Sequence, residues 1–144
     1  MSKADEAAEL FLQGYNCSQA LLATFGPELG LERETALRLA GPFGGGIGRT
    51  GGVCGALTGA IMAIGLKYSS GEVDAEAKER SYDAVRRLFE QFRVRTGSTA
   101  CRDLLGFDIG TSSGWAEAQR RDTHHTVCPA FVRAAAEVLE RVLA

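Results

Sequence analysis

The chain has 144 residues, of which 45% are hydrophobic and 24% charged, and it carries a net charge of −2. This composition is that of one globular domain, residues 1–144, with a hydrophobic core. The small net charge, with basic residues scattered among acidic ones, excludes the charge pattern of a protein that binds nucleic acid or an anionic membrane. The N-terminal segment MSKADEAAEL is polar and has no apolar signal core, so we expect a cytoplasmic protein.

Helix signals dominate the first half of the chain. Ser2 and Asn16 stand at helix-capping positions, and Gln19, three residues after Asn16, completes a capping box. The helices predicted here cover residues 2–12, 16–25, 32–40 and 53–68. A glycine-rich loop, residues 44–52, precedes the last of them, which carries no charge as far as Leu66 and is too short to span a bilayer.

Helices also account for most of the second half. Asp74 caps the longest one, an amphipathic helix that ends near Arg95. Short helices follow at about residues 101–105 and 115–121, and the last helix starts after Pro129. No alternating strand pattern of useful length is present. The prediction is therefore an all-α fold, a single-domain helical bundle with a glycine-rich loop before a central apolar helix.

The candidate functional residues are the four cysteines, Cys17, Cys54, Cys101 and Cys128. In a chain without an export signal they indicate redox or metal chemistry more than a disulfide framework, with four separate buried thiols as the alternative. All four fall at predicted helix starts, with Cys128 as a cap directly ahead of Pro129. The unpaired N–H groups and the partial positive charge of a helix N-terminus favour a thiolate.

Cys54 is the first candidate nucleophile because glycines flank it at the start of the apolar helix. Backbone amides left uncovered by glycines can donate to its sulfur, so we predict a pKa below the free-cysteine value of about 8.5. We also predict that the four thiols gather in one region beside the glycine-rich loop. At least one pair should be within disulfide reach, with Cα atoms within roughly 7 Å of each other.

Two short motifs point to other chemistry. Residues 46–51 spell G-x-G-x-x-G, but a broken helical segment precedes them where a dinucleotide site needs a strand, so we expect no nucleotide. His124 and His125 stand just before Cys128, and the His-x-x-Cys spacing from His125 can supply two metal ligands. The alternative for this segment is a polar loop ahead of a helix.

Several segments together resemble the C-GCAxxG-C-C family of redox-active proteins. They are GYNCSQA at residues 14–20, GGGIG at 44–48, CGALTGA at 54–60, CRDLLG at 101–106 and CP at 128–129. The chain reads C-G-A-x-x-G where the family's label spells G-C-A-x-x-G. The resemblance covers nearly the whole chain. It implies that Cys17, Cys54, Cys101 and Cys128 are the functional residues, and it implies no particular substrate.

Three functions fit this pattern. The first is thiol redox chemistry, in which two or more of the four cysteines cycle between dithiol and disulfide and act on a redox partner or a small-molecule substrate. The second is a binding module in which the four thiolates, with His125, hold zinc or an iron–sulfur cluster. The third is a structural protein with inert thiols. Four cysteines allow three pairings, and the sequence names neither the pairing, nor a cofactor, nor the oligomeric state.

Overall fold

The computed structural model describes all 144 residues and has the predicted all-α fold. Its α-helices are α1 (Lys3–Leu12), α2 (Cys17–Phe25), α3 (Arg33–Ala40), α4 (Gly55–Tyr68), α5 (Ala75–Thr96), α6 (Cys101–Leu105), α7 (Ser112–Arg121), α8 (Thr123–Thr126) and α9 (Cys128–Leu143). Two 3₁₀ turns, η1 (Pro27–Leu29) and η2 (Gly41–Phe43), follow α2 and α3. None of the helices combines the length and the apolarity needed to cross a membrane.

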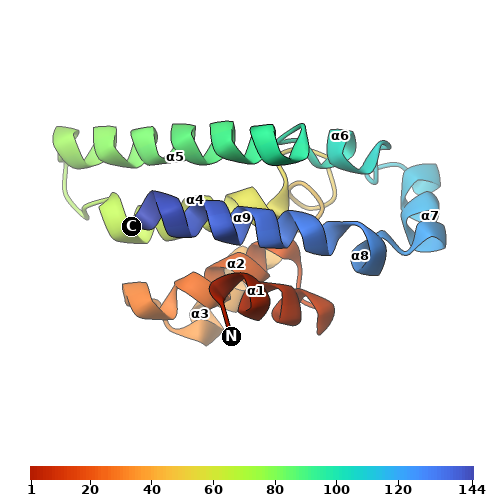
Figure 1. The fold of residues 1–144 in the computed structure, drawn as a ribbon, viewed down its shortest axis with the longest axis horizontal. Coiled ribbons are helices and arrows are strands. Elements are labelled where there is room, and N and C mark those ends of the chain that lie inside the picture. Colours follow the sequence, from red (N-terminus) through yellow and green to blue (C-terminus); the bar gives the residue numbers. More distant parts are fainter.

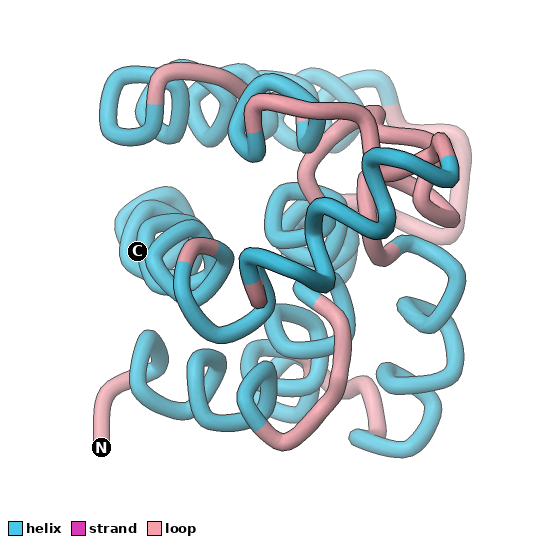
Figure 2. Tube along the Cα trace, turned by 90° about the vertical axis from the view of Figure 1, so that its right-hand side faces the viewer, coloured by secondary structure: helices cyan, strands magenta, loops and turns pink.

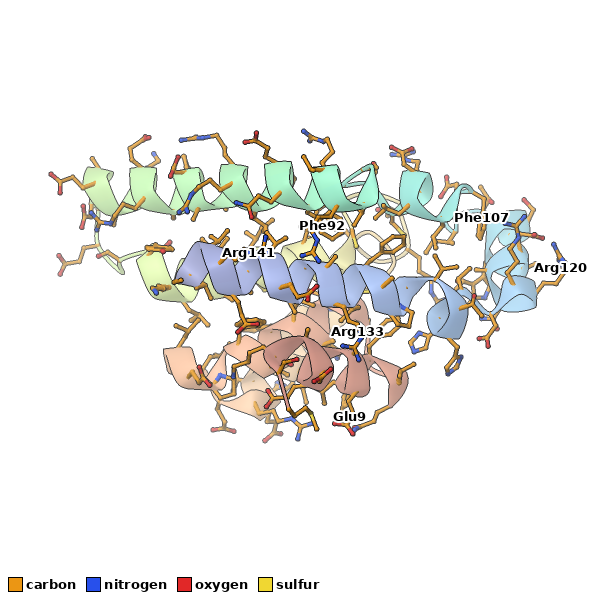
Figure 3. The ribbon with its side chains drawn as sticks, viewed as in Figure 1. Glu9, Phe92, Phe107, Arg120, Arg133 and Arg141 are labelled. Atoms are coloured by element: carbon orange, nitrogen blue, oxygen red, sulfur yellow. The ribbon has the colours of Figure 1, made fainter.

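The helices form three layers (Figure 1, Figure 2). The middle layer consists of α4 and α9, with α5 on one side of it and α1 to α3 on the other. One hydrophobic cluster of 25 buried residues joins the layers, and Phe92 of α5 is fully buried between its helix and the middle layer (Figure 3). At one end, on the right in Figure 1, α6, α7 and α8 lie together near the loop that precedes α4.

Local hydrogen bonds set the starts of the predicted helices. The Ser2 hydroxyl accepts a bond of 3.0 Å from the Asp5 N–H. The Asn16 side chain accepts one of 2.8 Å from the Gln19 N–H, and the Gln19 side chain accepts one of 2.9 Å from the Asn16 N–H. Asp74 caps α5 through a bond to the N–H three residues later. These caps confirm the starts predicted from the sequence.

The segment between α6 and α9 differs from the prediction. Helix α7 begins at Ser112 and not at Trp115, because the Thr111 hydroxyl accepts a hydrogen bond of 2.9 Å from the Gly114 N–H and caps the helix earlier. The segment of His124 and His125, for which a polar loop was the alternative interpretation, contains the short helix α8. Both differences lengthen the helical part of this end of the molecule.

Helices α2 and α4 pack closely because glycines face α2. A Cβ atom placed on Gly59 would lie 2.4 Å from the carbonyl oxygen of Ser18, and one on Gly55 would lie 3.1 Å from the Cβ of Cys17. The contact at Gly59 leaves no room for a side chain, so glycine is needed there, and the contact at Gly55 is tight. The close packing brings the starts of α2 and α4 together, and with them two of the cysteines.

Candidate functional site

A cavity of about 530 Å³ opens at the end of the bundle that contains α6 and α7 (Figure 1). All four cysteines line it, together with part of the glycine-rich loop. The predicted gathering of the thiols beside this loop is therefore confirmed. Each cysteine also stands at a helix start: Cys17, Cys101 and Cys128 are the first residues of α2, α6 and α9, and Cys54 is the N-cap of α4.

Backbone pairing holds the segments of Cys54 and Cys101 against each other. The Cys54 N–H donates to the Thr99 carbonyl at 2.8 Å, and the Cys101 N–H donates to the Gly52 carbonyl at 2.6 Å. These bonds flank an isolated antiparallel bridge between the two segments. Residues on either side of a bridge pair point to the same face, so Cys54 and Cys101 are diagonal neighbours.

Helix α9 contributes Cys128 from its first turn. The structure corrects the prediction that Cys128 is the cap, because Val127 occupies the cap position and α9 begins at Cys128. Pro129 follows within the first turn, where its missing N–H breaks no helical hydrogen bond. The thiol of Cys128 is half-buried and lines the cavity.

All four cysteines are free thiols. Cys54 is buried, with 5% of its surface exposed, and the other three are half-buried. The prediction that one pair lies within disulfide reach is wrong for this structure. Each thiol is fixed at its own helix start and lines the cavity from there.

Burial dominates the chemistry of Cys54. Loss of water raises the pKa of Cys54 to about 11, although the backbone amides of Ala56 and Leu57 at the helix start act to lower the pKa. The prediction of a pKa below the free-cysteine value is therefore wrong. Two amides at the helix start do not replace the hydration that a thiolate loses in an apolar site.

Burial and mutual repulsion raise the pKa values of the other thiols as well. The pKa of Cys17 lies well above its usual value, and those of Cys101 and Cys128 rise to about 12, each chiefly through burial. A charge on Cys54 adds to the rise in all three. Cys54 is therefore within electrostatic reach of the other three sulfurs, and the site holds neutral thiols at neutral pH.

Of the two histidines, His124 and not His125 lines the cavity. The His124 ring stacks on Phe11 with centroids 3.9 Å apart, and its Nε2 lies 2.8 Å from the Phe11 carbonyl oxygen. His125 is exposed, and its Nδ1 lies 2.8 Å from Asp122 Oδ1. Nowhere in the structure do three or more His, Cys, Asp or Glu side chains stand together as a metal site, so the four-cysteine and His125 ligand set is not assembled here.

The glycine-rich loop turns in a left-handed sense beside the thiols. Residues 45–49 all have positive φ angles, between 61° and 70°, and two of them, Ile47 and Arg49, are not glycine. A Cβ atom on Gly46 would lie 2.5 Å from the Gly52 nitrogen, so the two arms of the loop are in close contact. Helix α3 and the turn η2 precede this loop, in place of the strand that a dinucleotide fingerprint needs.

Arg49 and Trp115 are cavity residues that the sequence analysis did not single out. The guanidinium carbon of Arg49 lies 3.7 Å from the centroid of the Trp115 ring, and both residues line the cavity. They come from the glycine-rich loop and from α7, far apart in sequence. The chain has a single tryptophan. This was the one sequence feature that pointed to Trp115, and it does not predict Arg49 as the residue in contact with it.

Together the fold and the site define a helical protein with four thiols around one cavity. The sequence model of one protein family, described as “Putative redox-active protein (C_GCAxxG_C_C)”, matches residues 15–142, which include all four cysteines. The chain belongs to this family, so the resemblance drawn from the sequence is confirmed. Among curated proteins and among solved structures, none matches the chain.

Proposed function

We propose that the protein is a thiol redox protein that exchanges its cysteine thiols with a disulfide bound in the cavity. The observation that carries this proposal is the placement of all four cysteines on the wall of one cavity. The family's description as redox-active supports it. Four unrelated structural thiols would have no reason to border the same space.

Cys54 is the attacking thiol in this proposal. The backbone amides of Ala56 and Leu57 at the start of α4 favour its thiolate, whereas burial opposes it. Its charge also acts on each of the other three thiols, which places it centrally among them. Cys101 is the second thiol, since it is the diagonal neighbour of Cys54 across the backbone pairing and is half-buried.

The exchange balances in two steps. The Cys54 thiol loses its proton and attacks one sulfur of the substrate disulfide, whose S–S bond breaks, and one half leaves with that proton as a thiol. Cys101 then loses its proton and attacks the Cys54 sulfur, and the second half leaves as a thiol. The substrate disulfide is reduced by two electrons to two thiols, and the protein dithiol is oxidised to a disulfide.

The second step requires the two protein sulfurs to approach each other. A diagonal pair has its Cα atoms about 7–8 Å apart, slightly beyond the usual disulfide range of about 4.4–6.8 Å. In this proposal the short helix α6 moves inward into the cavity that both residues line. The protein disulfide would then form at the expense of cavity volume.

Mass spectrometry of the reduced protein after incubation with hydroxyethyl disulfide tests the proposal. Wild type should form an internal disulfide, Cys54→Ser should form no adduct, and Cys101→Ser should accumulate the mixed disulfide on Cys54. Circular dichroism verifies that each variant folds. Equal behaviour of all four single Cys→Ser variants would sink the proposal, as would stoichiometric thiol-bound metal in protein purified without oxygen.

A further inference from the structure

The cavity has two walls of different chemistry. One, the thiol wall, consists of Cys17, Cys54, Cys101 and Cys128. The other, the arginine wall, consists of Arg49 of the glycine-rich loop and Trp115 of α7. The thiol redox proposal gives a role to the first wall and none to the second.

The guanidinium of Arg49 is oriented but unpaired. Its carbon lies 3.7 Å from the Trp115 centroid, and stacking of this kind holds the planar group flat on the ring. Arg49 has no ion pair within the chain. The carboxylate of Asp108 beside the loop accepts from the Gly110 N–H, and that of Asp122 at the cavity faces His125. The donor edge of Arg49 is therefore free for an anion from outside the chain.

The loop holds Arg49 in an unfavourable backbone conformation. Its φ of 64° is left-handed, as is the φ of 68° of the β-branched Ile47 two residues earlier. Left-handed backbone is unfavourable for residues other than glycine, because the Cβ atom comes too close to the following carbonyl oxygen. Strain of this kind is concentrated at functional sites, where it fixes a side chain in a chosen direction. Here it places the guanidinium over Trp115 at the cavity.

The size of the cavity fits a small molecule, and Arg49 is the one arginine or lysine among its lining residues, which also include Asp122. A volume of about 530 Å³ is that of a small-molecule site and is too small for a folded partner. Because burial keeps the thiols protonated, no thiolate repels an anion that enters at neutral pH. The lining of the cavity also includes Phe11, Leu104 and Phe131, which suit an apolar linker.

We propose that the cavity binds a small disulfide that carries a carboxylate, with the carboxylate on Arg49 and the S–S bond toward Cys54. The reaction that follows rests on the proposed redox function, whereas the binding does not. Arg49 is here a specificity-determining residue. It selects the charge of the substrate and takes no part in the sulfur exchange.

Binding is tested first with a ligand that cannot be reduced. Suberate is the all-carbon counterpart of dithiodipropionate, and octanediol is its neutral counterpart. Trp115 is the only tryptophan, so its fluorescence reports binding beside Arg49 without other signals. Suberate should bind wild type, and Arg49→Gln should weaken it about tenfold, the effect of losing one charged hydrogen bond. Octanediol should bind both proteins equally and weakly.

Matched variants separate recognition from structure. Arg38→Gln removes the same charge from an exposed arginine of α3 outside the cavity and should leave suberate binding unchanged. Arg49→Lys keeps the charge without the planar fork and should bind suberate with intermediate affinity. It also keeps the test valid if Arg49→Gln folds poorly. Equal suberate affinity in wild type, Arg49→Gln and Arg49→Lys would overturn the inference, as would no binding to any of them.

Kinetics then separate this inference from the redox proposal. In single-turnover reactions of the reduced protein, Arg49→Gln should raise the dithiodipropionate concentration needed for half-maximal rate about tenfold and leave the maximal rate, and the reduction of neutral hydroxyethyl disulfide, unchanged. If neither disulfide is reduced while suberate still binds through Arg49, the redox proposal fails and the binding site stands. If both disulfides are reduced equally well by wild type and Arg49→Gln, the redox proposal stands and the carboxylate preference is refuted.

Discussion

The thiol wall and the arginine wall face the same cavity, but they are built on different kinds of backbone. The thiols stand at helix starts, three of them at α2, α4 and α9 in the layers that share the hydrophobic core. Arg49 and Trp115 are exposed and stand on a left-handed loop and on a helix outside the layered bundle. Geometry that is set by the core should resist substitution at the surface, whereas geometry that is set by a strained loop should be adjustable without unfolding the protein.

The largest expected effect is loss of stability at alkaline pH, and it comes from the thiol wall. Cysteines of the unfolded chain ionise near pH 8.5, whereas the pKa of Cys54 in the folded protein is about 11. The unfolded state therefore releases protons first, so stability is complete below about pH 8.5 and falls as the pH rises toward 11. Cys54 alone should contribute about 3 kcal/mol to this fall.

Urea denaturation under reducing conditions at pH 7 and at several values up to pH 11 measures this effect. Lysine and tyrosine side chains also titrate in this range, so the informative quantity is the difference between wild type and Cys54→Ser. The variant should lose less stability over the same range. Parallel curves for the two proteins would mean that Cys54 ionises in the folded state as it does in the unfolded chain.

The next effect concerns the packing that joins α2 and α4 behind the thiol wall. Gly59→Ala places a Cβ atom 2.4 Å from the Ser18 carbonyl oxygen and should cost about 1–3 kcal/mol, as overpacking does. Gly65→Ala lies on the same helix with no atom closer than 4.0 Å to the new Cβ and should stabilise by up to about 1 kcal/mol. Thermal denaturation of both variants measures the difference, and similar melting temperatures would contradict the close packing.

In the glycine-rich loop that carries Arg49, a substitution should instead raise the stability of the protein. Ile47 is 44% exposed and has a φ of 68°, so Ile47→Gly removes strain and little packing. The gain from relaxed backbone exceeds the entropy that glycine adds to the unfolded chain, which leaves about 0.5–1 kcal/mol of stabilisation. Leu39→Gly, at an exposed position of α3, should destabilise by a similar amount. A loss of stability in both variants would show that the loop is not strained at Ile47.

Much of the thiol wall could be predicted from the sequence because local signals define it. The capping box at Asn16 and the proline at Pro129 mark two helix starts, and Cys17 and Cys128 are adjacent to them. The helix starts at Cys54 and Cys101 have no side-chain cap. The pKa of Cys54 could not be predicted, since it depends on a balance between two amides and complete burial. That balance is decided by the packing of α4 in the core, which no local pattern describes.

The arginine wall could not be predicted for a different reason. Its contact joins residues of a glycine-rich loop and of α7 that no periodic pattern connects, and the left-handed φ of Arg49 is a conformation that its residue type disfavours. Tertiary structure also decides which of His124 and His125 lines the cavity, because α8 turns the ring of His124 toward Phe11 and leaves that of His125 at the surface. The backbone pairing of the Cys54 and Cys101 segments could not be predicted either, because a single bridge is too short to produce an alternating pattern of apolar and polar residues.

The smallest expected effect is on the stability of Arg49→Gln itself. A stacked guanidinium on a partly exposed ring contributes about 0.5–1 kcal/mol, and glutamine at a left-handed position keeps the backbone strain. The variant should therefore lose no more than about 1 kcal/mol relative to wild type, while Arg38→Gln should stay within about 0.5 kcal/mol of it. Urea denaturation without ligand measures both.

A loss of several kcal/mol would mean that Arg49 stabilises the contact between the loop and α7. Weaker suberate binding by Arg49→Gln would then result from disorder in this part of the cavity and not from the missing charge. A small loss of stability together with a tenfold loss of suberate affinity would instead show that the strained loop is needed for ligand binding. Arg49 would then contribute too little to the stability of the fold to offset the backbone strain by itself.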